Sequence, residues 1–150
     1  MKQNLHNEYL AAAKGLASLP AKAEFSVAWT APSNIALVKY WGKKPGQIPA
    51  NPSISFALEE SVTRVSVEGS RLPTPIGPLV EYYFEGGANS RFGDRFVKYL
   101  KEVTRYLPLL RSLRLLIRSE NTFPHSSGIA SSASSFAALA LCLVDMERQL

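Results

Sequence analysis

One segment of the chain, residues 121–135, joins a loop of small residues to an apolar helix. It reads Asn-Thr-Phe-Pro-His-Ser-Ser-Gly-Ile-Ala-Ser-Ser-Ala-Ser-Ser, and mostly apolar residues follow it. Gly128 and the serines leave room for a ligand to approach the backbone closely, and the N-terminus of a helix carries a positive dipole end. The segment therefore predicts an anion site, with phosphate as the anion expected there.

This prediction must be compared with two other structures, a Walker phosphate loop and an ordinary helix start. The segment has no G-x-x-x-x-G-K-[ST] pattern and no lysine beside it, so it is not a Walker loop. Serine and threonine also crowd the first positions of ordinary helices, where they satisfy local backbone groups. From this segment alone, a phosphate site and an ordinary helix start are both open.

A cluster of cations and aromatic rings lies nearer the start of the chain. Within residues 31–44 it contains Lys39, Tyr40, Trp41, Lys43 and Lys44, and a Pro-Gly pair then breaks the segment. Three cations beside two aromatic rings that can hydrogen-bond could clamp a small ligand with several negative charges. The alternative is a solvated lysine turn that follows a strand.

Hydrophobic periodicity predicts a chain of mixed strands and helices. Alternation predicts strands at 25–30, 35–40, 54–58, 61–67, 79–84 and 113–119, with a break at 31–33, a turn after 58 and a proline-rich loop at 71–78. Helical spacing predicts helices over about 4–19, over about 17 residues from Asn89 or Ser90, and from about Ser131 onward. We expect one domain whose last two helices contribute these core residues: Phe92, Phe96, Tyr99, Leu100, Val103, Leu107, Phe136, Leu139, Ala140, Leu143 and Met146.

The composition is that of a soluble globular domain, with 46% hydrophobic and 19% charged residues. The net charge of +5 comes from scattered basic residues without an arginine-rich run, so we expect an anionic small molecule and not a nucleic acid. Cys142 is the only cysteine and lies among leucines, which favours a core residue over a nucleophile and a cytoplasmic location over an oxidising one. The sequence shows no signal peptide and no stretch long enough for a membrane span.

Four blocks of the sequence, taken together, match a known family. They are Pro32-Ser-Asn-Ile-Ala, Lys39-Tyr-Trp-Gly-Lys43, Asn51-Pro-Ser-Ile-Ser55 and Phe123-Pro-His-Ser-Ser-Gly-Ile-Ala-Ser-Ser-Ala133. In their order and approximate spacing, the chain from about Phe25 onward resembles diphosphomevalonate decarboxylase, of the GHMP small-molecule kinase superfamily. The Lys-Tyr-Trp-Gly-Lys block is far more specific than the serine-rich loop, which the whole superfamily shares in some form.

The resemblance implies an α+β fold, the GHMP-kinase N-terminal domain (ribosomal protein S5 domain 2-like), with helices packed on one face of the strands. Residues 1–150 would form this ATP- and substrate-binding domain, with 1–22 as a helical extension. The family's Gly-Ser-Gly-Ser-Ala-x-Arg segment and its catalytic aspartate do not occur in this sequence. We therefore expect an N-terminal part that is incomplete at the C-terminus, lacks the C-terminal GHMP domain and is inactive alone.

The family reaction, in the mevalonate pathway of isoprenoid biosynthesis, converts mevalonate 5-diphosphate and ATP to isopentenyl diphosphate, ADP, phosphate and carbon dioxide. By resemblance, Lys39 is the catalytic residue at the reacting end of the substrate, and Asn34 orients neighbouring side chains. The resemblance assigns substrate binding to Tyr40, Trp41, Gly42, Lys43 and, by a looser match, Arg91, and ATP binding to Ser127, Gly128, Ser131 and Ser132. It also implies Mg²⁺, with Ser132 as a candidate ligand, and a homodimer for the full-length enzyme.

Two positions depart from the family pattern. His125 replaces a small threonine and could either bond a phosphate or support the edge of the loop, and Asn51-Pro52 replaces the commoner Asn-Ser. These departures leave related activities open, namely a mevalonate 5-phosphate decarboxylase or a mevalonate 3-kinase. A non-catalytic phosphate-binding fragment is the further alternative.

Overall fold

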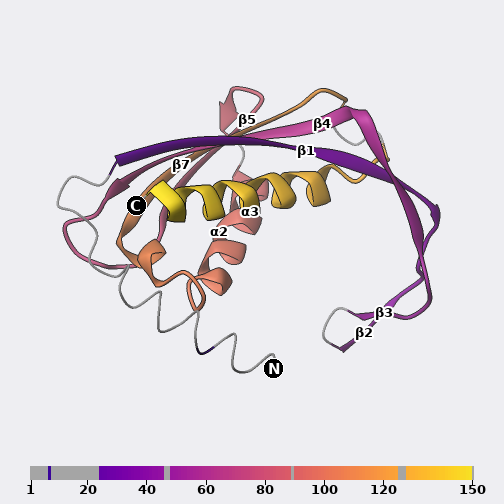
Figure 1. Cartoon of the computed structure of the whole chain (residues 1–150), viewed down its shortest axis with the longest axis horizontal. Helices are drawn as coiled ribbons and strands as arrows, with labels where there is room; N and C mark the ends of the chain where they lie inside the picture. Colours follow the sequence, from indigo (N-terminus) through magenta and orange to yellow (C-terminus); the bar gives the residue numbers. More distant parts are fainter. Residues whose placement is uncertain (1–6, 8–23, 46–47, 89, 125–127, 150) are drawn as a thin grey trace.

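A five-stranded sheet forms one layer of the molecule, and two helices pack on one of its faces (Figure 1). This computed structural model describes residues 7, 24–45, 48–88, 90–124 and 128–149. The strands are, in spatial order, β1 (Glu24–Val38), β4 (Ile54–Arg71), β7 (Leu113–Asn121), β5 (Leu79–Phe84) and β6 (Gly87–Ala88). The expected α+β fold with helices on one face is confirmed.

All neighbouring strands of this sheet are antiparallel except β5 and β7, which are parallel. A parallel pair needs a long crossover connection, because the chain must return to the same end of the sheet. Here α2 (Ser90–Val103) and the short 3-10 helix η2 (Pro108–Ser112) provide it. The last helix, α3 (Ser131–Gln149), then packs mainly against β1 and β4.

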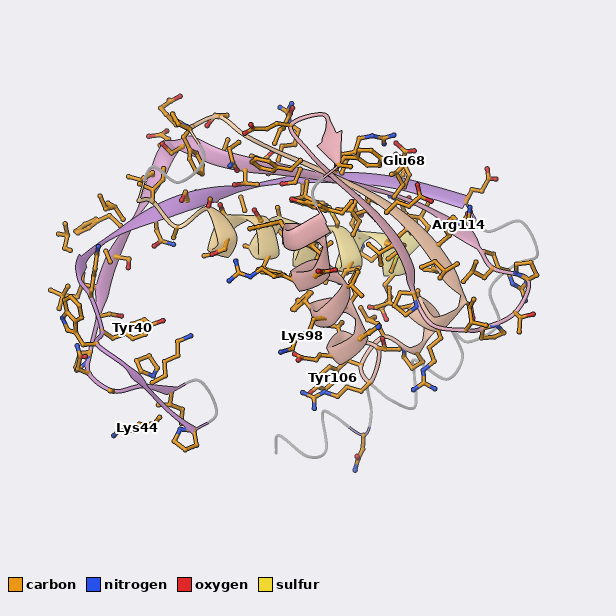
Figure 2. The ribbon with its side chains drawn as sticks, turned by 180° about the vertical axis from the view of Figure 1, so that it is seen from behind. Tyr40, Lys44, Glu68, Lys98, Tyr106 and Arg114 are labelled. Carbon is orange, nitrogen blue, oxygen red and sulfur yellow. The ribbon has the colours of Figure 1, made fainter. Side chains whose placement is uncertain are left out.

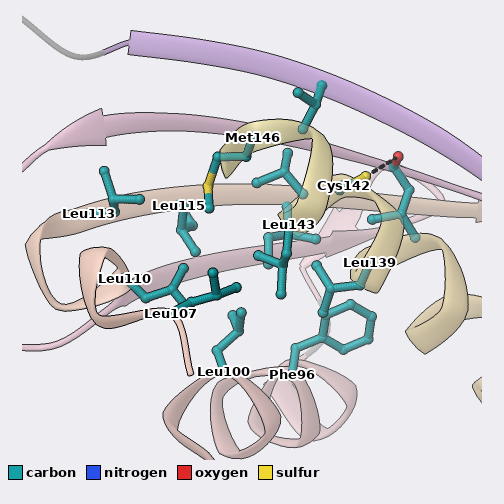
Figure 3. Close-up of a cluster of buried hydrophobic side chains, with 14 of the residues drawn as sticks. Phe96, Leu100, Leu107, Leu110, Leu113, Leu115, Leu139, Cys142, Leu143 and Met146 are labelled. Atoms are coloured by element: carbon teal, nitrogen blue, oxygen red, sulfur yellow. Dashed lines mark hydrogen bonds between the residues drawn. The ribbon is translucent and has the colours of Figure 1, made fainter. Parts of the chain in front are cut away.

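The hydrophobic core lies between the sheet and the two helices (Figure 3). On β7 the side chains of Leu113, Leu115 and Ile117 are fully buried, while every second residue faces the other side of the sheet. The predicted core is largely confirmed, because these helix residues are buried: Phe96, Leu100, Leu139, Leu143 and Met146. The rings of Phe96 and Phe136 stack with centroids 5.0 Å apart, which joins α2 to α3.

Cys142 belongs to this core, as predicted. Its side chain is fully buried, and its Sγ–H donates to the Val65 carbonyl at 3.4 Å. Burial raises the pKa of the Cys142 thiol to about 11, so the thiolate that a nucleophile needs is disfavoured. The Cys142 side chain therefore packs in the core, and these properties disfavour a role as a nucleophile.

β1 and β4 are each one continuous strand, although the sequence predicted two strands in each place. The predicted break at 31–33 and the predicted turn after Leu58 were wrong. Pro32 is tolerated inside β1 because β1 is an edge strand, where a missing N–H can face away from the ladder. β1 also ends at Val38, so Lys39 and Tyr40 follow the strand and do not belong to it.

The interruption that the sequence pattern indicated is a bulge in β4. Pro32 pairs with Val62, but Ser33 pairs with Leu58, so residues 59–61 have no partner on β1. Three extra residues are an odd number, so the face of β4 that matches the inner face of β1 changes from odd to even residue numbers here. This change of phase explains why the hydrophobic pattern predicted two separate strands.

Beyond the bulge, β1 and β4 continue as a two-stranded ribbon that curves away from the sheet (Figure 1). The described residues between Ser33 and Leu58 are termed the arm. Its far end carries a small hairpin of β2 (Lys43–Lys44) and β3 (Ile48–Pro49). These apolar side chains of the arm are 43–84% exposed: Ile35, Leu37, Val38, Trp41, Ile48, Ile54 and Phe56. Backbone pairing, and not a packed core, therefore shapes the arm.

The remaining elements agree with the predictions in part. β5 spans the predicted residues, α3 begins at Ser131 as expected, and β7 is two residues longer than predicted. α2 has 14 residues and ends at Val103, so it is shorter than the predicted length of about 17 residues. Pro108 disfavours helical geometry at Leu107 and begins the separate 3-10 helix η2. The predicted N-terminal helix and extension lie outside the described residues, apart from Asn7.

No helix in the described part of the chain combines the length and the apolar character that crossing a bilayer requires.

Candidate functional site

The two segments predicted to bind anions are joined through β1. The Ala130 N–H, just before α3, donates to the Asn34 carbonyl of β1 at 3.1 Å. Lys39 lies five residues further along the same chain. Five extended residues span at most about 17 Å, which is therefore the largest possible distance between the backbones of Asn34 and Lys39.

Residues 128–130, which the structure describes just before α3, lead directly into the helix. Gly128 has φ of 84°, a left-handed conformation that glycine adopts without strain. The Ala130 carbonyl accepts the N–H groups of Ala133 and Ser134 at 3.1 and 3.2 Å, which starts the helix. The first turn contains no acidic residue, so the positive end of the helix dipole is not neutralised there.

The serines of this segment that the structure describes divide into two pairs. Ser134 and Ser135 are buried, and their hydroxyls donate to the Ser131 carbonyl at 3.0 and 2.7 Å. Ser131 and Ser132 are half-buried, so their hydroxyls can meet a ligand. Of the residues predicted for ATP, Gly128, Ser131 and Ser132 thus lie together at the start of α3. Ser127, like His125, lies outside the described residues.

A buried polar network fixes the start of α3 against the sheet. The Thr63 hydroxyl of β4 donates to Asn121 Oδ1 of β7 at 2.7 Å. Its oxygen can accept the proton of the Ser134 hydroxyl, 2.7 Å away on α3, as the alternative to the bond from Ser134 to the Ser131 carbonyl. Thr63 is fully buried, so these bonds form away from water, where a lost partner is costly. The sequence reasoning missed this network, and its only local signal is a threonine at an inward position of a strand.

Thr122 connects the loop to the bend of the arm. Its hydroxyl donates to the Glu60 carbonyl at 2.7 Å and accepts the Val62 N–H at 3.0 Å, and its own N–H donates to the Val62 carbonyl at 3.0 Å. Glu60 lies within the unpaired part of β4. The hydrogen bonds of Thr122 therefore connect the bulge of β4 to the first residues of the serine-rich loop. The sequence reasoning did not identify this connection.

The lysine turn begins where β1 ends. Gly42 has φ of 101°, which confirms the expectation that glycine allows the chain to turn after Lys39 and Tyr40. The Lys43 ammonium lies 5.9 Å from the centre of the Tyr40 ring, within the range of a cation–π contact. Trp41 is 84% exposed. The turn therefore presents its cations and rings at the surface.

Asn51, which lies on the segment that returns from the hairpin towards β4, binds the backbone of this turn through its side chain. Its Oδ1 accepts the Trp41 N–H at 2.9 Å, and its Nδ2 donates to the Lys39 carbonyl at 3.3 Å and to the Pro52 carbonyl at 2.8 Å. The Gly42 carbonyl accepts the N–H of Ala50 at 3.1 Å next to it. The sequence reasoning quoted Asn51 as part of a motif but gave it no role.

A groove of about 560 Å³ lies beside the start of α3. It runs between α2 and α3 and is lined by Arg95, Lys98, Tyr99, Glu102, Ser132, Ala133 and Phe136. Arg95 and Lys98 add positive charge next to Ser132, and sequence reasoning missed both, although their spacing places them on one face of α2. Tyr40 and Lys44 do not line this groove and lie on the arm, whereas Lys98 lies on α2 (Figure 2).

Arg91 lies in the first turn of α2, next to β5, where Gly93 contacts Tyr82. The position of its side chain is outside the described residues, so its role at the site stays a prediction. Asn34 contributes its backbone carbonyl to the loop before α3, and the orienting role predicted for its side chain also stays a prediction.

Charge separates the two sides of the molecule. From Lys39 to Leu58 the chain contains no acidic residue, so the turn is purely cationic. On the sheet face away from the helices, by contrast, arginines pair with carboxylates: Arg64 with Glu120 at 3.0 Å, and Arg118 with Glu68. Some of the scattered basic residues seen in the sequence are thus neutralised by carboxylates on this face of the sheet. The turn and the start of α3 contain no acidic residue and remain positive.

Known proteins resemble this chain in sequence and in fold. Residues 31–149 match the family model of the diphosphomevalonate decarboxylase-like N-terminal domain. Diphosphomevalonate decarboxylase of Saccharomyces cerevisiae is 33% identical over 127 residues, which cover 77% of this chain and 32% of that protein. The crystal structure of mevalonate diphosphate decarboxylase from Staphylococcus aureus superposes with a TM-score of 0.70 at 34% identity, covering 85% of this chain and 38% of that one.

A further solved structure is that of MDDEF in complex with MVAPP, AMPPCP and magnesium. It has a TM-score of 0.66 at 30% identity and covers 85% of this chain and 38% of that one. The chain therefore belongs to the family of diphosphomevalonate decarboxylase-like N-terminal domains. It spans about a third of the length of the curated relatives it matches.

Proposed function

We propose that the complete protein catalyses the ATP-dependent decarboxylation of mevalonate 5-diphosphate to isopentenyl diphosphate. The observation that carries this proposal is the link between the two positive segments. The Ala130 N–H binds the Asn34 carbonyl of β1, and Lys39 is the first residue after the end of that strand. Two polyanions can then lie side by side. The relative solved with MVAPP, AMPPCP and magnesium supports a pair of ligands of this kind.

On the substrate side, the lysine turn provides charge and hydrogen-bond donors for a diphosphate. Tyr40, Trp41, Gly42 and Lys43 bind the diphosphate, and Lys39 acts at the reacting end, where charge develops as phosphate leaves. Phosphoryl transfer depends mostly on positioning and electrostatics, so a fixed cation is an effective catalytic group. Arg91 adds a further contact to the substrate, and Asn34 orients its neighbours.

On the nucleotide side, the start of α3 binds the ATP phosphates. Gly128 allows close approach of the backbone, and Ser131 and Ser132 offer hydroxyl donors beside the positive helix end. Ser127 completes the set assigned by the resemblance. ATP phosphorylates the tertiary 3-hydroxyl of the substrate, and the phosphate then leaves as the carboxylate is lost as carbon dioxide.

The residues present fit a magnesium ion that arrives with the nucleotide. The described part of the chain holds no cluster of three or more His, Cys, Asp or Glu side chains that could bind a metal. Magnesium commonly binds through substrate phosphates with few protein ligands, and Ser132 can provide one hydroxyl. Ser132 would help to hold the ion, which would supply positive charge to neutralise the phosphates.

Release of carbon dioxide from carboxyl-labelled mevalonate 5-diphosphate by the complete gene product tests the proposal. We expect release only with both ATP and Mg²⁺, and loss of release in Lys39→Ala and Ser132→Ala. Ser70→Ala, on the sheet face away from the helices, is the matched control for the serine and should leave the rate unchanged.

Turnover of mevalonate 5-phosphate with none of the diphosphate would replace the proposal by a monophosphate decarboxylase. Phosphorylation of mevalonate without carbon dioxide release would indicate a 3-kinase. Binding of nucleotide without turnover of any of these compounds would favour a non-catalytic phosphate-binding protein.

A further inference from the structure

We infer that Asn51 is a positioning residue for substrate binding, through the conformation of the lysine turn. The inference rests on the proposed function, because it names the residue that holds the proposed diphosphate-binding turn in shape. Asn51 is itself set back from the exposed side chains of that turn: it is half-buried, whereas Trp41 is 84% exposed. Its role is therefore to hold the turn and not to touch the ligand.

The side chain of Asn51 makes three hydrogen bonds to backbone groups. One goes to the Trp41 N–H and one to the Lys39 carbonyl, so the same amide binds the turn at two points on either side of Tyr40. The third, to the Pro52 carbonyl, orients the amide from its own strand. A single side chain thus bridges the outgoing and returning chains of the arm.

The pattern of donors and acceptors requires an amide at this position. The oxygen faces an N–H group, and the nitrogen faces two carbonyl oxygens. An aspartate would keep the first bond but would place a negative oxygen against both carbonyls. A leucine has nearly the same shape and would remove all three bonds without adding charge.

The turn depends on such a contact because its surroundings hold it weakly. Gly42 is free to adopt many backbone conformations, and the nearby apolar side chains of the arm are exposed instead of packed. Fixing one residue's backbone costs about 1–2 kcal/mol of conformational entropy, so a turn that is already ordered loses less on binding. With Asn51 in place, Tyr40 and Lys43 stay paired and face a ligand together.

Substrate and nucleotide binding by the complete gene product distinguish this role from a general structural one. For Asn51→Leu and Asn51→Asp we expect the Kd of mevalonate 5-diphosphate to rise at least about tenfold, measured by titration calorimetry. The Kd of an unreactive ATP analogue and the melting temperature should stay unchanged, because the core and the start of α3 do not contact Asn51. Asn7→Leu, at an exposed asparagine outside the site, is the matched control and should bind both ligands as wild type does.

The outcomes separate this inference from the proposed function. Equal substrate Kd values for wild type and both Asn51 variants would overturn the inference and leave the proposed function intact. Equal weakening of substrate and nucleotide together with a lower melting temperature would also overturn it, since that pattern reports a loss of fold. If the wild type binds no mevalonate 5-diphosphate, the proposed function fails first, and the inference falls with it.

Discussion

The strand pair β1–β4 has two halves that are stabilised in different ways. One half lies in the sheet under α3, and the other half is the arm. Near the sheet, their inward side chains lie under α3, and Val65 and Val67 are fully buried. In the arm, Leu37 and Phe56 are 66% and 57% exposed. The comparison teaches that a strand pair can pass from a packed environment to an exposed one within a few residues, with the bulge at 59–61 as the boundary.

The difference matters for function because the two halves carry different tasks. The packed half holds the start of α3 in place through Thr63, Asn121 and Ser134. The arm carries the lysine turn and holds it with backbone pairing and Asn51. Thr122 joins the two at the bulge. Stability and substrate binding should therefore respond to different substitutions.

The largest expected effect is on stability and belongs to the packed half. Leu115→Ala removes a fully buried side chain and should lower the free energy of unfolding by roughly 2–5 kcal/mol. Leu37→Ala makes the same chemical change in the arm, where we expect a change within about 0.5 kcal/mol. Urea denaturation of both variants measures the contrast. Similar losses in the two would mean that the arm is packed in solution and would break the comparison.

The next effect is on binding and belongs to the arm. Lys43→Ala should raise the KM for mevalonate 5-diphosphate by the loss of a charge-assisted contact, worth roughly 1.5–3 kcal/mol, with little change in the KM for ATP. Lys44→Ala removes the same charge from the next residue of β2, whose side chain leaves the opposite face of the strand, and should have a smaller effect. Steady-state kinetics of the complete protein would decide against the role of Lys43 if its substrate KM were unchanged.

The smallest expected effect is on the pH dependence of stability, and it tests whether water is excluded from the core of the packed half. The thiol of Cys142 ordinarily has a pKa of 9.0, and burial raises it to about 11 in the folded chain. Below pH 9 the thiol is protonated in both states, but as the pH rises from 9 to 11 only the unfolded chain loses the proton, so stability falls. Between pH 8 and 10 we expect wild type to lose about 1 kcal/mol more than Cys142→Ala does. Parallel pH profiles of the two proteins would show that water reaches the thiol.

Local sequence patterns predicted the packed half well. The span of β5, the start of α3 at Ser131 and the buried face of the last helix all follow from alternation or helical spacing within one segment. The two candidate anion-binding segments were also proposed from local composition, and their binding roles stay predictions. Where the pattern that determines a structure lies within one segment, the residues of that segment are sufficient to predict it.

The arm and its joints could not be predicted in the same way. The continuity of β4 depends on pairing with β1, so a change of phase within one strand was interpreted as a turn between two. Asn51 acts on Lys39 and Trp41, and Thr122 acts on residues about 60 positions earlier. Such contacts depend on which distant segments of the chain lie side by side in the fold. No pattern inside either segment contains that information.

The exposed arm also bears on how a protein of this kind can diverge. A main chain paired strand to strand keeps its course whatever side chains it carries outward, so changes at Leu37, Trp41 or Phe56 leave the sheet and the two helices intact. If the turn binds substrate as proposed, new substrate preferences can arise there without a compensating change in the interior. The three residues of the β4 bulge mark the border between the part of the molecule that tolerates such variation and the part that does not.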